Sequence, residues 1–329
     1  MLLFSLFLRY DARMSGPQLS LFPEAAHAPT LRDVAEAVRA AGIDGLPDAI
    51  KRADQARYQE VHVKSALAEA KGMPFRWTLN PYRGCTHACE YCYARKYQRH
   101  LELDAGDTFS TLIFVKQNLP DALRRELGRP SWTRESVAIG TATDPYQPIE
   151  GHYRLTRSCL DVLIDAETPF SITTKGPMVV RDIDLLLRAS ARAGARVNMS
   201  IPSMDEEAWA KLEPGTAPPA QRLRAAKTLM DAGVEVGVMM MPLVPGITTS
   251  RSSIERTVGA IRDAGVPFIG SCVTHLEPGV RDHFFGFLRK SFPELVDGYE
   301  RLYQGSYAPA SYAEAVKNVV RGCLERSVK

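Results

Sequence analysis

Apolar residues follow two alternating patterns from residue 75 onward. Short apolar runs, which are typical of buried strands, alternate with segments in which apolar residues recur every three or four positions, as on one face of a helix. The strand-like runs are Phe75–Leu79, Thr111–Lys116, Val137–Gly140, Phe170–Thr174, Val197–Ile201, Val234–Met240 and Phe268–Val273. About six strand–helix repeats predict a parallel sheet covered by helices, either an open doubly wound sheet or a full or partial (β/α) barrel.

Helical spacing extends to both sides of this alternation. The helix-like segments are Leu31–Ala41, Pro47–Gln59, Leu155–Ala166, Val180–Ala193, Pro219–Ala232, Ser252–Ala264, Phe284–Ser291 and Tyr312–Glu325. Gly194, Gly233 and Gly265 follow three of them and are expected just beyond the helix ends. Residues 1–30 lack a sustained period. We therefore predict a flexible tail over 1–30, a helical extension over 31–62, a core over 63–295 and C-terminal helices that form a cap over 296–329.

The composition leaves the choice of partner open. The chain has 329 residues, of which 45% are hydrophobic and 24% charged, and a formal net charge of only +3. This balance is typical of globular proteins and does not point to a nucleic-acid or membrane partner. The apolar start, Met1 to Leu8, is too short to span a bilayer and lacks the basic residues that lead a secretory signal. We expect a cytoplasmic protein without a membrane partner, whose translation starts at Met1 or Met14.

Three of the six cysteines lie within eight residues, as Cys85-Thr-His-Ala-Cys89-Glu-Tyr-Cys92. Clustered thiols without a secretion signal indicate a reducing compartment and a metal site. Three thiolates satisfy three irons of a cubane and leave the fourth iron free for a small molecule. The alternative is a structural zinc site, which needs four ligands, and His87 would have to supply the fourth from the same tight loop. The spacing favours a [4Fe–4S] cluster held by Cys85, Cys89 and Cys92.

The C-x3-C-x2-C spacing, with aromatic Tyr91 before the last cysteine, resembles the signature of the radical S-adenosylmethionine (radical SAM) superfamily. The segments 73–85, 92–95 and 143–148 resemble the branch that includes spore photoproduct lyase and "DNA repair photolyase" relatives. The resemblance implies a partial barrel of six strands, with the cluster after the first strand. It also implies that S-adenosylmethionine is reductively cleaved to a 5′-deoxyadenosyl radical, which abstracts a substrate hydrogen. The electron would come from a donor such as flavodoxin or ferredoxin.

The resemblance further implies residues that bind S-adenosylmethionine. Tyr91 and Tyr93 are expected near the adenine. Thr143 and Asp144, in the loop after the second barrel strand, are expected at the amino group of the methionine. A carboxylate facing an ammonium is favourable, but an Asp-Pro pair is also an ordinary start of a turn.

Polar residues also end the third and fourth barrel strands. By the same resemblance, Lys175 contacts the carboxylate or adenosine of S-adenosylmethionine, and Ser200 contacts its ribose. Either residue alone is also compatible with a solvated strand end. Arg222 is expected to pair with the cofactor carboxylate, and an ion pair with Glu213 is the alternative.

The sequence departs from the lyase pattern at one position. Spore photoproduct lyase returns a hydrogen to its product radical from a cysteine near the second-strand loop, where Thr141 stands in this chain. A threonine O–H bond is too strong for that step, so Cys272, near the end of the sixth strand, is the candidate hydrogen donor. Its alternative is a small buried core residue, the interpretation we also give to Cys159 and Cys323.

The tail contains a short peptide, Gln18-Leu19-Ser20-Leu21-Phe22, that resembles the motif by which bacterial repair proteins dock on the DNA sliding clamp. Leu21 and Phe22 would fill an apolar pocket while Gln18 forms hydrogen bonds at its rim. A packing role against the barrel is the alternative.

The sequence thus supports three hypotheses. The first is a radical SAM enzyme that acts on DNA or its damage products. The second keeps this chemistry but directs it at RNA, a peptide or a metabolite. The third is a non-catalytic iron–sulfur or zinc protein that uses its tail and C-terminal helices for interactions, with a metal site that does not bind S-adenosylmethionine.

Overall fold

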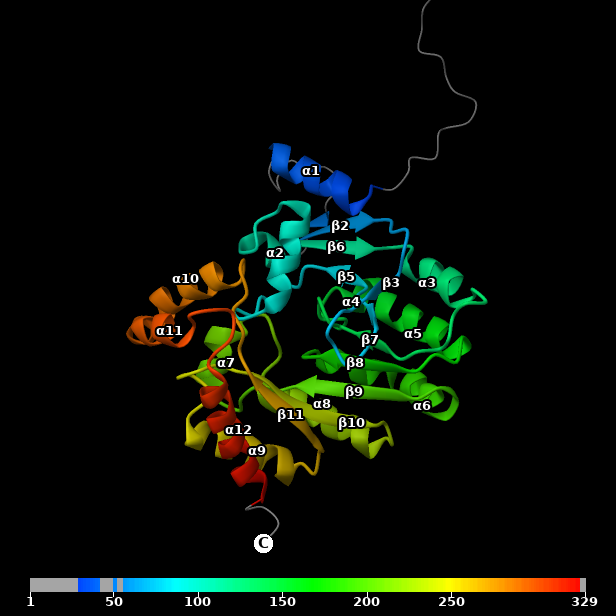
Figure 1. Ribbon diagram of the computed structural model, residues 1–329. Helices are drawn as coiled ribbons and strands as arrows, with labels where there is room; N and C mark the ends of the chain where they lie inside the picture. Colours follow the sequence, from blue (N-terminus) through cyan, green and yellow to red (C-terminus); the bar gives the residue numbers. More distant parts are fainter. Residues whose placement is uncertain (1–28, 42–49, 52–55, 326–329) are drawn as a thin grey trace, which may run out of the picture.

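The computed structural model describes residues 29–41, 50–51 and 56–325, which form two sheets (Figure 1). The larger sheet has the strand order β11-β10-β9-β8-β7-β4-β3, in which β3 is antiparallel to β4 and the other neighbours are parallel. Its strands are β3 (Leu67–Glu69), β4 (Trp77–Leu79), β7 (Val137–Ile139), β8 (Phe170–Thr174), β9 (Ala195–Ser200), β10 (Val236–Leu243) and β11 (Phe268–Val273). The six predicted barrel strands are confirmed, with small shifts of their ends.

The parallel strands form an incomplete barrel. Within the described ranges, the edge strands β3 and β11 do not pair with each other. Strands β4 and β7 to β11 are parallel, so their carboxyl ends meet at the same edge of the sheet. Barrel enzymes hold their ligands at this edge. The fold is the partial six-stranded barrel that the radical SAM resemblance implies, and not a doubly wound sheet.

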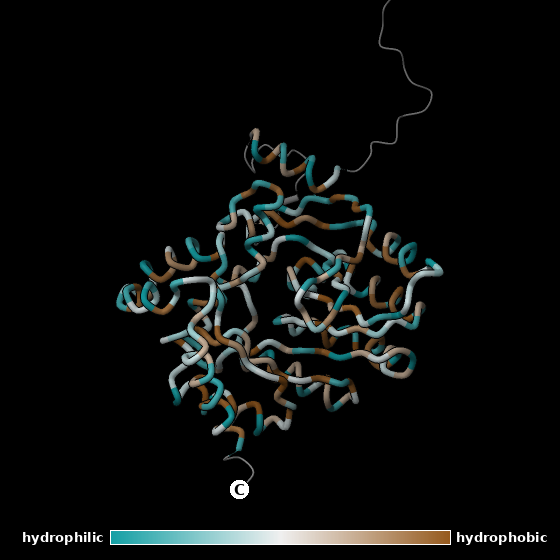
Figure 2. Tube along the Cα trace, in the orientation of Figure 1, coloured by the Kyte–Doolittle hydropathy of each residue, from teal (hydrophilic) through white to brown (hydrophobic). Residues whose placement is uncertain are grey.

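Helices cover the outer face of this sheet (Figure 1). They are α3 (Leu119–Leu127), α5 (Leu155–Asp165), α6 (Ile183–Arg192), α8 (Pro219–Asp231), α9 (Arg251–Asp263) and α12 (Ala310–Glu325). Their buried residues join those of the strands in one core, and Figure 2 shows apolar segments along the strands and these helices. Gly194, Gly233 and Gly265 have positive φ angles of 99°, 91° and 70° after α6, α8 and α9, which confirms the predicted helix ends.

A second, four-stranded sheet lies beside the barrel. Its order is β1-β2-β6-β5, with β1 (Ile50–Lys51), β2 (Arg57–Val61), β6 (Leu112–Lys116) and β5 (Tyr82–Arg83). Helix α1 (Leu31–Ala41) packs on it through Val34, Ala35 and Val38. The prediction of a helix over 47–59 is wrong at its described end, because residues 57–61 form β2 and pair with β6. The run at 111–116 forms a strand as predicted, but in this sheet and not in the barrel.

The C-terminal helices are α10 (Arg281–Ser291), α11 (Val296–Leu302) and α12. Helices α10 and α11 form a separate apolar cluster with Phe284, Tyr299 and Tyr303, whereas α12 packs on the main core through Val316 and Val320. The shorter helices are η2 (Tyr93–Leu101), α2 (Asp107–Thr111), α4 (Glu150–Tyr153), η3 (Pro177–Asp182), α7 (Glu206–Leu212) and η4 (Pro293–Leu295). Within the described ranges, no helix has the length and apolar composition needed to cross a membrane.

Candidate active site

The loop that carries the three clustered cysteines follows β5 and closes on itself. Cys85 donates from its backbone to Phe109 across 2.9 Å, and short turns join Ala88 to Cys85 and Cys92 to Cys89. Cys85 and Cys89 are buried, Cys92 is half-buried, and all three are free thiols. The sequence motif therefore folds into a compact loop whose sulfur atoms lie in protein surroundings.

Burial favours the neutral form of these thiols. Desolvation raises the pKa of all three, to about 12 for Cys85. Buried thiolates are therefore unfavourable unless a cation compensates their charge, as iron does. Within the described part of the chain, no three His, Cys, Asp or Glu residues lie close enough to hold a single metal ion. Three thiols with no fourth ligand are the donors that a [4Fe–4S] cluster with one open iron needs, so the chemistry of this set fits the cluster.

Gln147 fixes the start of the cysteine loop. Its side-chain oxygen accepts a hydrogen bond of 3.1 Å from the backbone of Thr86. Its amide nitrogen donates to the carbonyl of Gly84 at 3.3 Å and to the hydroxyl of Thr143 at 3.0 Å. Gln147 is fully buried, and nothing in the sequence around it distinguishes it from its polar neighbours.

Arg95 and Gly215 fix the middle of the loop. The buried Arg95 guanidinium donates to the carbonyls of Ala88 and Cys89 at 3.1 and 3.2 Å. Gly215 donates from its backbone to the carbonyl of His87 at 3.1 Å, and a side chain at this glycine would collide with the backbone of Thr86. Long-range contacts of this kind hold the thiols in place.

Asp144 lies beneath the loop with both carboxylate oxygens occupied. One oxygen accepts from the backbone of Tyr146 at 2.8 Å and from the Thr174 hydroxyl at 2.6 Å. The other accepts from the backbone of Lys175 at 2.7 Å and lies 3.3 Å from His87 Nδ1. Burial alone would raise the pKa of Asp144, but His87 and these hydrogen bonds lower it to about 2. Asp144 therefore forms the turn that an Asp-Pro pair favours, and its contact with the methionine amino group stays a prediction.

A second group of predicted residues gathers around Glu213. Lys175 Nζ donates to the Ser200 hydroxyl at 2.7 Å and lies 3.6 Å from a Glu213 oxygen. Tyr91 donates from its hydroxyl to the same carboxylate. Burial would raise the pKa of Glu213, but Arg222 and Lys175 lower it. The structure thus brings Tyr91, Lys175, Ser200 and Arg222 together, and Glu213, which the sequence offered only as an ion-pair partner, joins them.

Arg222 forms the alternative ion pair. Its fully buried guanidinium contacts Glu213 and donates to Ser200 O at 3.1 Å, Ala217 O at 2.7 Å and Thr216 Oγ1 at 2.7 Å. Each guanidinium nitrogen has a protein acceptor. Arg222 consequently orients Glu213 and the end of β9.

Tyr93 and Cys272 form a further group of predicted site residues, in which the Cys272 thiol is close enough to act on Tyr93. Tyr93 donates to the backbone oxygen of Thr141, and Asn80 donates to the Thr141 hydroxyl at 3.2 Å. Cys272 on β11 is exposed, so the expectation of a buried core residue is wrong for it, whereas Cys159 and Cys323 are buried as expected. Desolvation by the surrounding walls raises the pKa of the Cys272 thiol, and Lys175 and Lys317 act against this rise.

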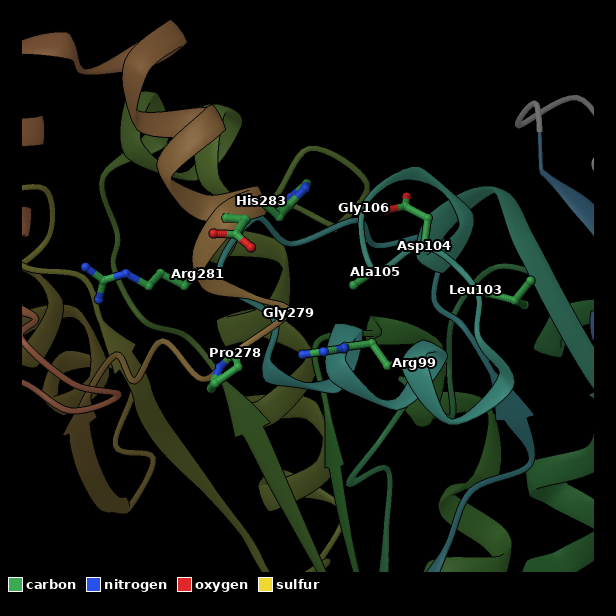
Figure 3. A pocket seen from close by; sticks show the side chains of 10 residues that line it. Arg99, Leu103, Asp104, Ala105, Gly106, Pro278, Gly279, Arg281 and His283 are labelled. Carbon is green, nitrogen blue, oxygen red and sulfur yellow. The ribbon is translucent and has the colours of Figure 1, made fainter. Parts of the chain in front are cut away.

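A hollow of about 670 Å³ lies beside the end of η2, the helix that follows the cysteine loop (Figure 3). It lies between the segment 99–106 and the start of α10 at residues 278–283. Arg95 donates to Gly106 O at 2.7 Å in its lining and reaches the carbonyl of Cys89 with the same guanidinium. His283, also in the lining, lies 2.6 Å from a Glu90 carboxylate oxygen, so two side chains connect this hollow to the loop.

Residues 79–274 match the family model described as the radical SAM superfamily. The chain belongs to the radical SAM superfamily. Members of this superfamily are enzymes that use a [4Fe–4S] cluster and S-adenosylmethionine. The cysteine loop and the polar strand ends described above lie within the matched residues.

This radical SAM protein is similar in sequence to two relatives and in fold to one solved structure. An uncharacterised protein of Mycobacterium bovis is 39% identical over 287 residues, which cover 86% of this chain and 82% of the relative. The radical SAM Nalpha-GlyT isomerase of Pseudomonas phage M6 is 27% identical over 170 residues, 51% of this chain and 33% of that protein. A mutant spore photoproduct lyase with bound AdoMet and dinucleoside spore photoproduct has a TM-score of 0.65 at 14% identity, over 83% of this chain and 80% of that chain. At that identity the likeness shows the fold alone.

Proposed function

We propose that this radical SAM enzyme abstracts a hydrogen atom from a nucleic-acid substrate, with DNA repair as its setting. Cys85, Cys89 and Cys92 hold the cluster. When bound, the cluster supplies the electron that cleaves S-adenosylmethionine to methionine and a 5′-deoxyadenosyl radical. The observation that carries this proposal is the meeting of the cysteine loop with the polar ends of β8 and β9, where Lys175 and Ser200 are 2.7 Å apart.

We assign these polar ends to the cofactor. The Lys175 ammonium has donor capacity for a carboxylate, and the Ser200 hydroxyl has donor and acceptor capacity for a ribose. Tyr91 and Tyr93 pack near the adenine, and Thr143 and Asp144 shape the wall at the methionine amino group.

Arg222 acts in this assignment through Glu213. Arg222 contacts one Glu213 oxygen and Lys175 Nζ lies 3.6 Å from the other, so the carboxylate orients the ammonium toward the site. Arg222 is therefore proposed as a positioning residue for the carboxylate end of the cofactor.

Cys272 is our candidate hydrogen donor. An S–H bond is weaker than the O–H bond of Thr141, and Cys272 is exposed near Lys175 and Tyr93. Donation converts the thiol to a thiyl radical as the substrate radical gains hydrogen. Reversal of a photoproduct through Thr141 is not part of the proposal.

The phage relative supports a second candidate reaction. Its name describes an isomerase of Nalpha-GlyT, and an isomerisation returns the abstracted hydrogen without a net change in oxidation state. RNA, peptide or metabolite substrates, and a non-catalytic iron–sulfur protein, are the remaining alternatives.

The first experiment is anaerobic reconstitution with iron and sulfide. After reduction with dithionite, 5′-deoxyadenosine is measured by chromatography, with Cys89→Ala as the control. We expect the wild type to produce 5′-deoxyadenosine and Cys89→Ala to produce none. A complete cluster that neither binds nor cleaves S-adenosylmethionine contradicts the proposal. Deuterium transfer to damaged oligonucleotides then tests the substrate.

The electron donor needs a place to approach the cysteine loop. Radical SAM enzymes need a reductant, and we propose that a flavodoxin- or ferredoxin-like protein in the cytoplasm approaches the hollow of Figure 3, because Arg95 and His283 connect its lining to the cysteine loop. Arg99→Glu, in the lining, is expected to slow reduction by the protein donor and not by dithionite. Equal rates with the protein donor contradict this approach.

Clamp docking through Gln18–Phe22 lies outside the described residues and stays a proposal from the sequence. The test compares binding of purified sliding clamp to the full chain and to the double variant Leu21→Ala/Phe22→Ala. Loss of binding in the variant supports docking, and equal binding contradicts it.

A further inference from the structure

Three aromatic rings form a row from the cysteine loop to the surface. The ring centroids of Tyr93 and His275 are 5.6 Å apart with an interplanar angle of 35°, and those of His275 and Tyr307 are 5.5 Å apart at 23°. Tyr93 directly follows the cluster cysteine Cys92. At the outer end, 69% of Tyr307 is exposed to solvent. A large aromatic side chain so exposed has a free face on which another ring can stack.

Backbone contacts hold the row in place. His275 and Tyr307 form an antiparallel β-bridge, and Leu276 donates from its backbone to Ser306 O at 2.7 Å. The Tyr303 hydroxyl donates to Thr274 O at 2.7 Å, which ties the same two segments together beneath the rings. The outer rings are therefore preorganised, and a ligand that stacks on them has little ordering cost to overcome.

Two lysines lie on the elements next to the ends of the row, Lys96 on η2 with Tyr93 and Lys317 on α12, which starts three residues after Tyr307. Lys317 is exposed on α12, close enough to act on the Cys272 thiol, and has no carboxylate within ion-pair distance among the described residues. The inner cation, Lys96, pairs with Glu277 at 2.7 Å. An open aromatic face, with an exposed lysine on the helix that follows it, fits a base and its phosphate.

We propose that Tyr307 and His275 are a stacking platform for a nucleobase of single-stranded or extrahelical nucleic acid, with Lys317 facing the backbone phosphate. This inference rests on the proposed function and specifies how the substrate is held. Stacking tolerates every base, because each has an aromatic face. A base on Tyr307 lies at the mouth of the site, in line with Tyr93 and the cysteine loop.

The test compares protein variants, each measured with a strand that has bases and with a strand that lacks them. Fluorescence anisotropy measures the affinity of the full-length, cluster-loaded protein for an eight-nucleotide oligothymidylate and for the same backbone without bases. The wild type is expected to bind the oligothymidylate about tenfold more tightly than the abasic strand. Tyr307→Ala should lose this preference, and Tyr307→Phe, which keeps the ring, should retain it. His275→Ala should reduce it in the same direction.

Two controls separate stacking from charge and from general damage. Lys317→Ala should lower the affinity of the protein for both strands equally and should lower the salt dependence of binding. Leu187→Ala removes an exposed apolar side chain from α6, on another element, and should change neither affinity. Circular dichroism establishes that each variant is folded.

The outcomes distinguish this inference from the function on which it rests. If the wild type binds neither strand, the nucleic-acid substrate is wrong and the platform with it. If the wild type binds both strands equally, or Tyr307→Ala keeps the preference for bases, the platform is wrong and the nucleic-acid substrate stands. Slower reduction of Tyr307→Ala by a protein donor, with unchanged oligonucleotide affinity, would assign the row to electron entry and likewise overturn it.

Discussion

The Lys175 ammonium at the end of β8 donates a hydrogen bond of 2.7 Å to the Ser200 hydroxyl at the end of β9. The two residues are neighbours because β8 and β9 are parallel and end at the same edge of the sheet. Ser200 also donates to Met241 O at 3.0 Å, which extends this polar edge to β10. A ligand that lies across these strand ends meets both side chains.

Lys175→Met is expected to weaken the binding of S-adenosylmethionine about tenfold or more, because it removes a charged hydrogen-bond donor and keeps the length of the side chain. Equilibrium dialysis with the cluster-loaded protein measures the affinity. Lys211→Met, at an exposed lysine that pairs with Glu207 on α7, serves as the control. Unchanged affinity of Lys175→Met would remove Lys175 from the cofactor site.

Glu213→Gln is expected to lower the free energy of unfolding by about 3 kcal/mol or more, because Arg222 is left buried without its charge partner. Urea unfolding of the metal-free protein measures the change. Glu207→Gln breaks an exposed pair and should cost about 0.5 kcal/mol or less. Similar costs for the two variants would show that the buried pair adds no special stability.

Gln147→Leu is expected to reduce the iron content after reconstitution, because it removes the hydrogen bonds that hold Thr86 and Gly84. The iron-to-protein ratio and the cluster absorbance provide the measurement. Gln304→Leu changes an exposed glutamine just beyond the end of α11 and is expected to load normally. Full loading of Gln147→Leu would mean that the other contacts suffice to place the loop.

How far the sequence predicts this molecule depends on the range of each interaction. The barrel strands and helices, and the ends of α6, α8 and α9, follow local periodicity and glycine positions. Strand β2 was missed because its apolar residues Tyr58 and Val61 also fit a helical spacing, and its pairing with β6 involves residues far along the chain. Local patterns do not reveal such pairing.

The candidate site shows the same division. The cysteine motif is local, so the sequence alone shows it. Glu213 and Gln147 act through contacts with residues distant in sequence, Lys175 and Thr86, so no spacing indicates them. The burial of Asp144 beside His87 likewise depends on how the loop folds back, which no local pattern shows.

Lys116 offers a test of pH dependence outside the cysteine loop. It lies at the end of β6, and its ammonium donates to Asn80 O at 2.7 Å. Desolvation, with the nearby Arg83, lowers its pKa to about 8. The folded protein therefore loses this proton at a lower pH than the unfolded chain. Between pH 8 and about 10.4, the unfolded state binds more protons, so this residue makes the free energy of unfolding rise with pH.

Lys116→Met is expected to remove a rise of up to about 3 kcal/mol over this interval. The raised pKa values of the buried thiols act in the opposite direction, because the unfolded chain loses thiol protons first. The difference between wild type and variant therefore isolates the lysine. Urea unfolding of the reduced, metal-free proteins at pH 7.5 and pH 10 measures it, with the exposed Lys64→Met as control. Parallel pH profiles for wild type and Lys116→Met would show that Lys116 keeps an ordinary pKa in the folded protein.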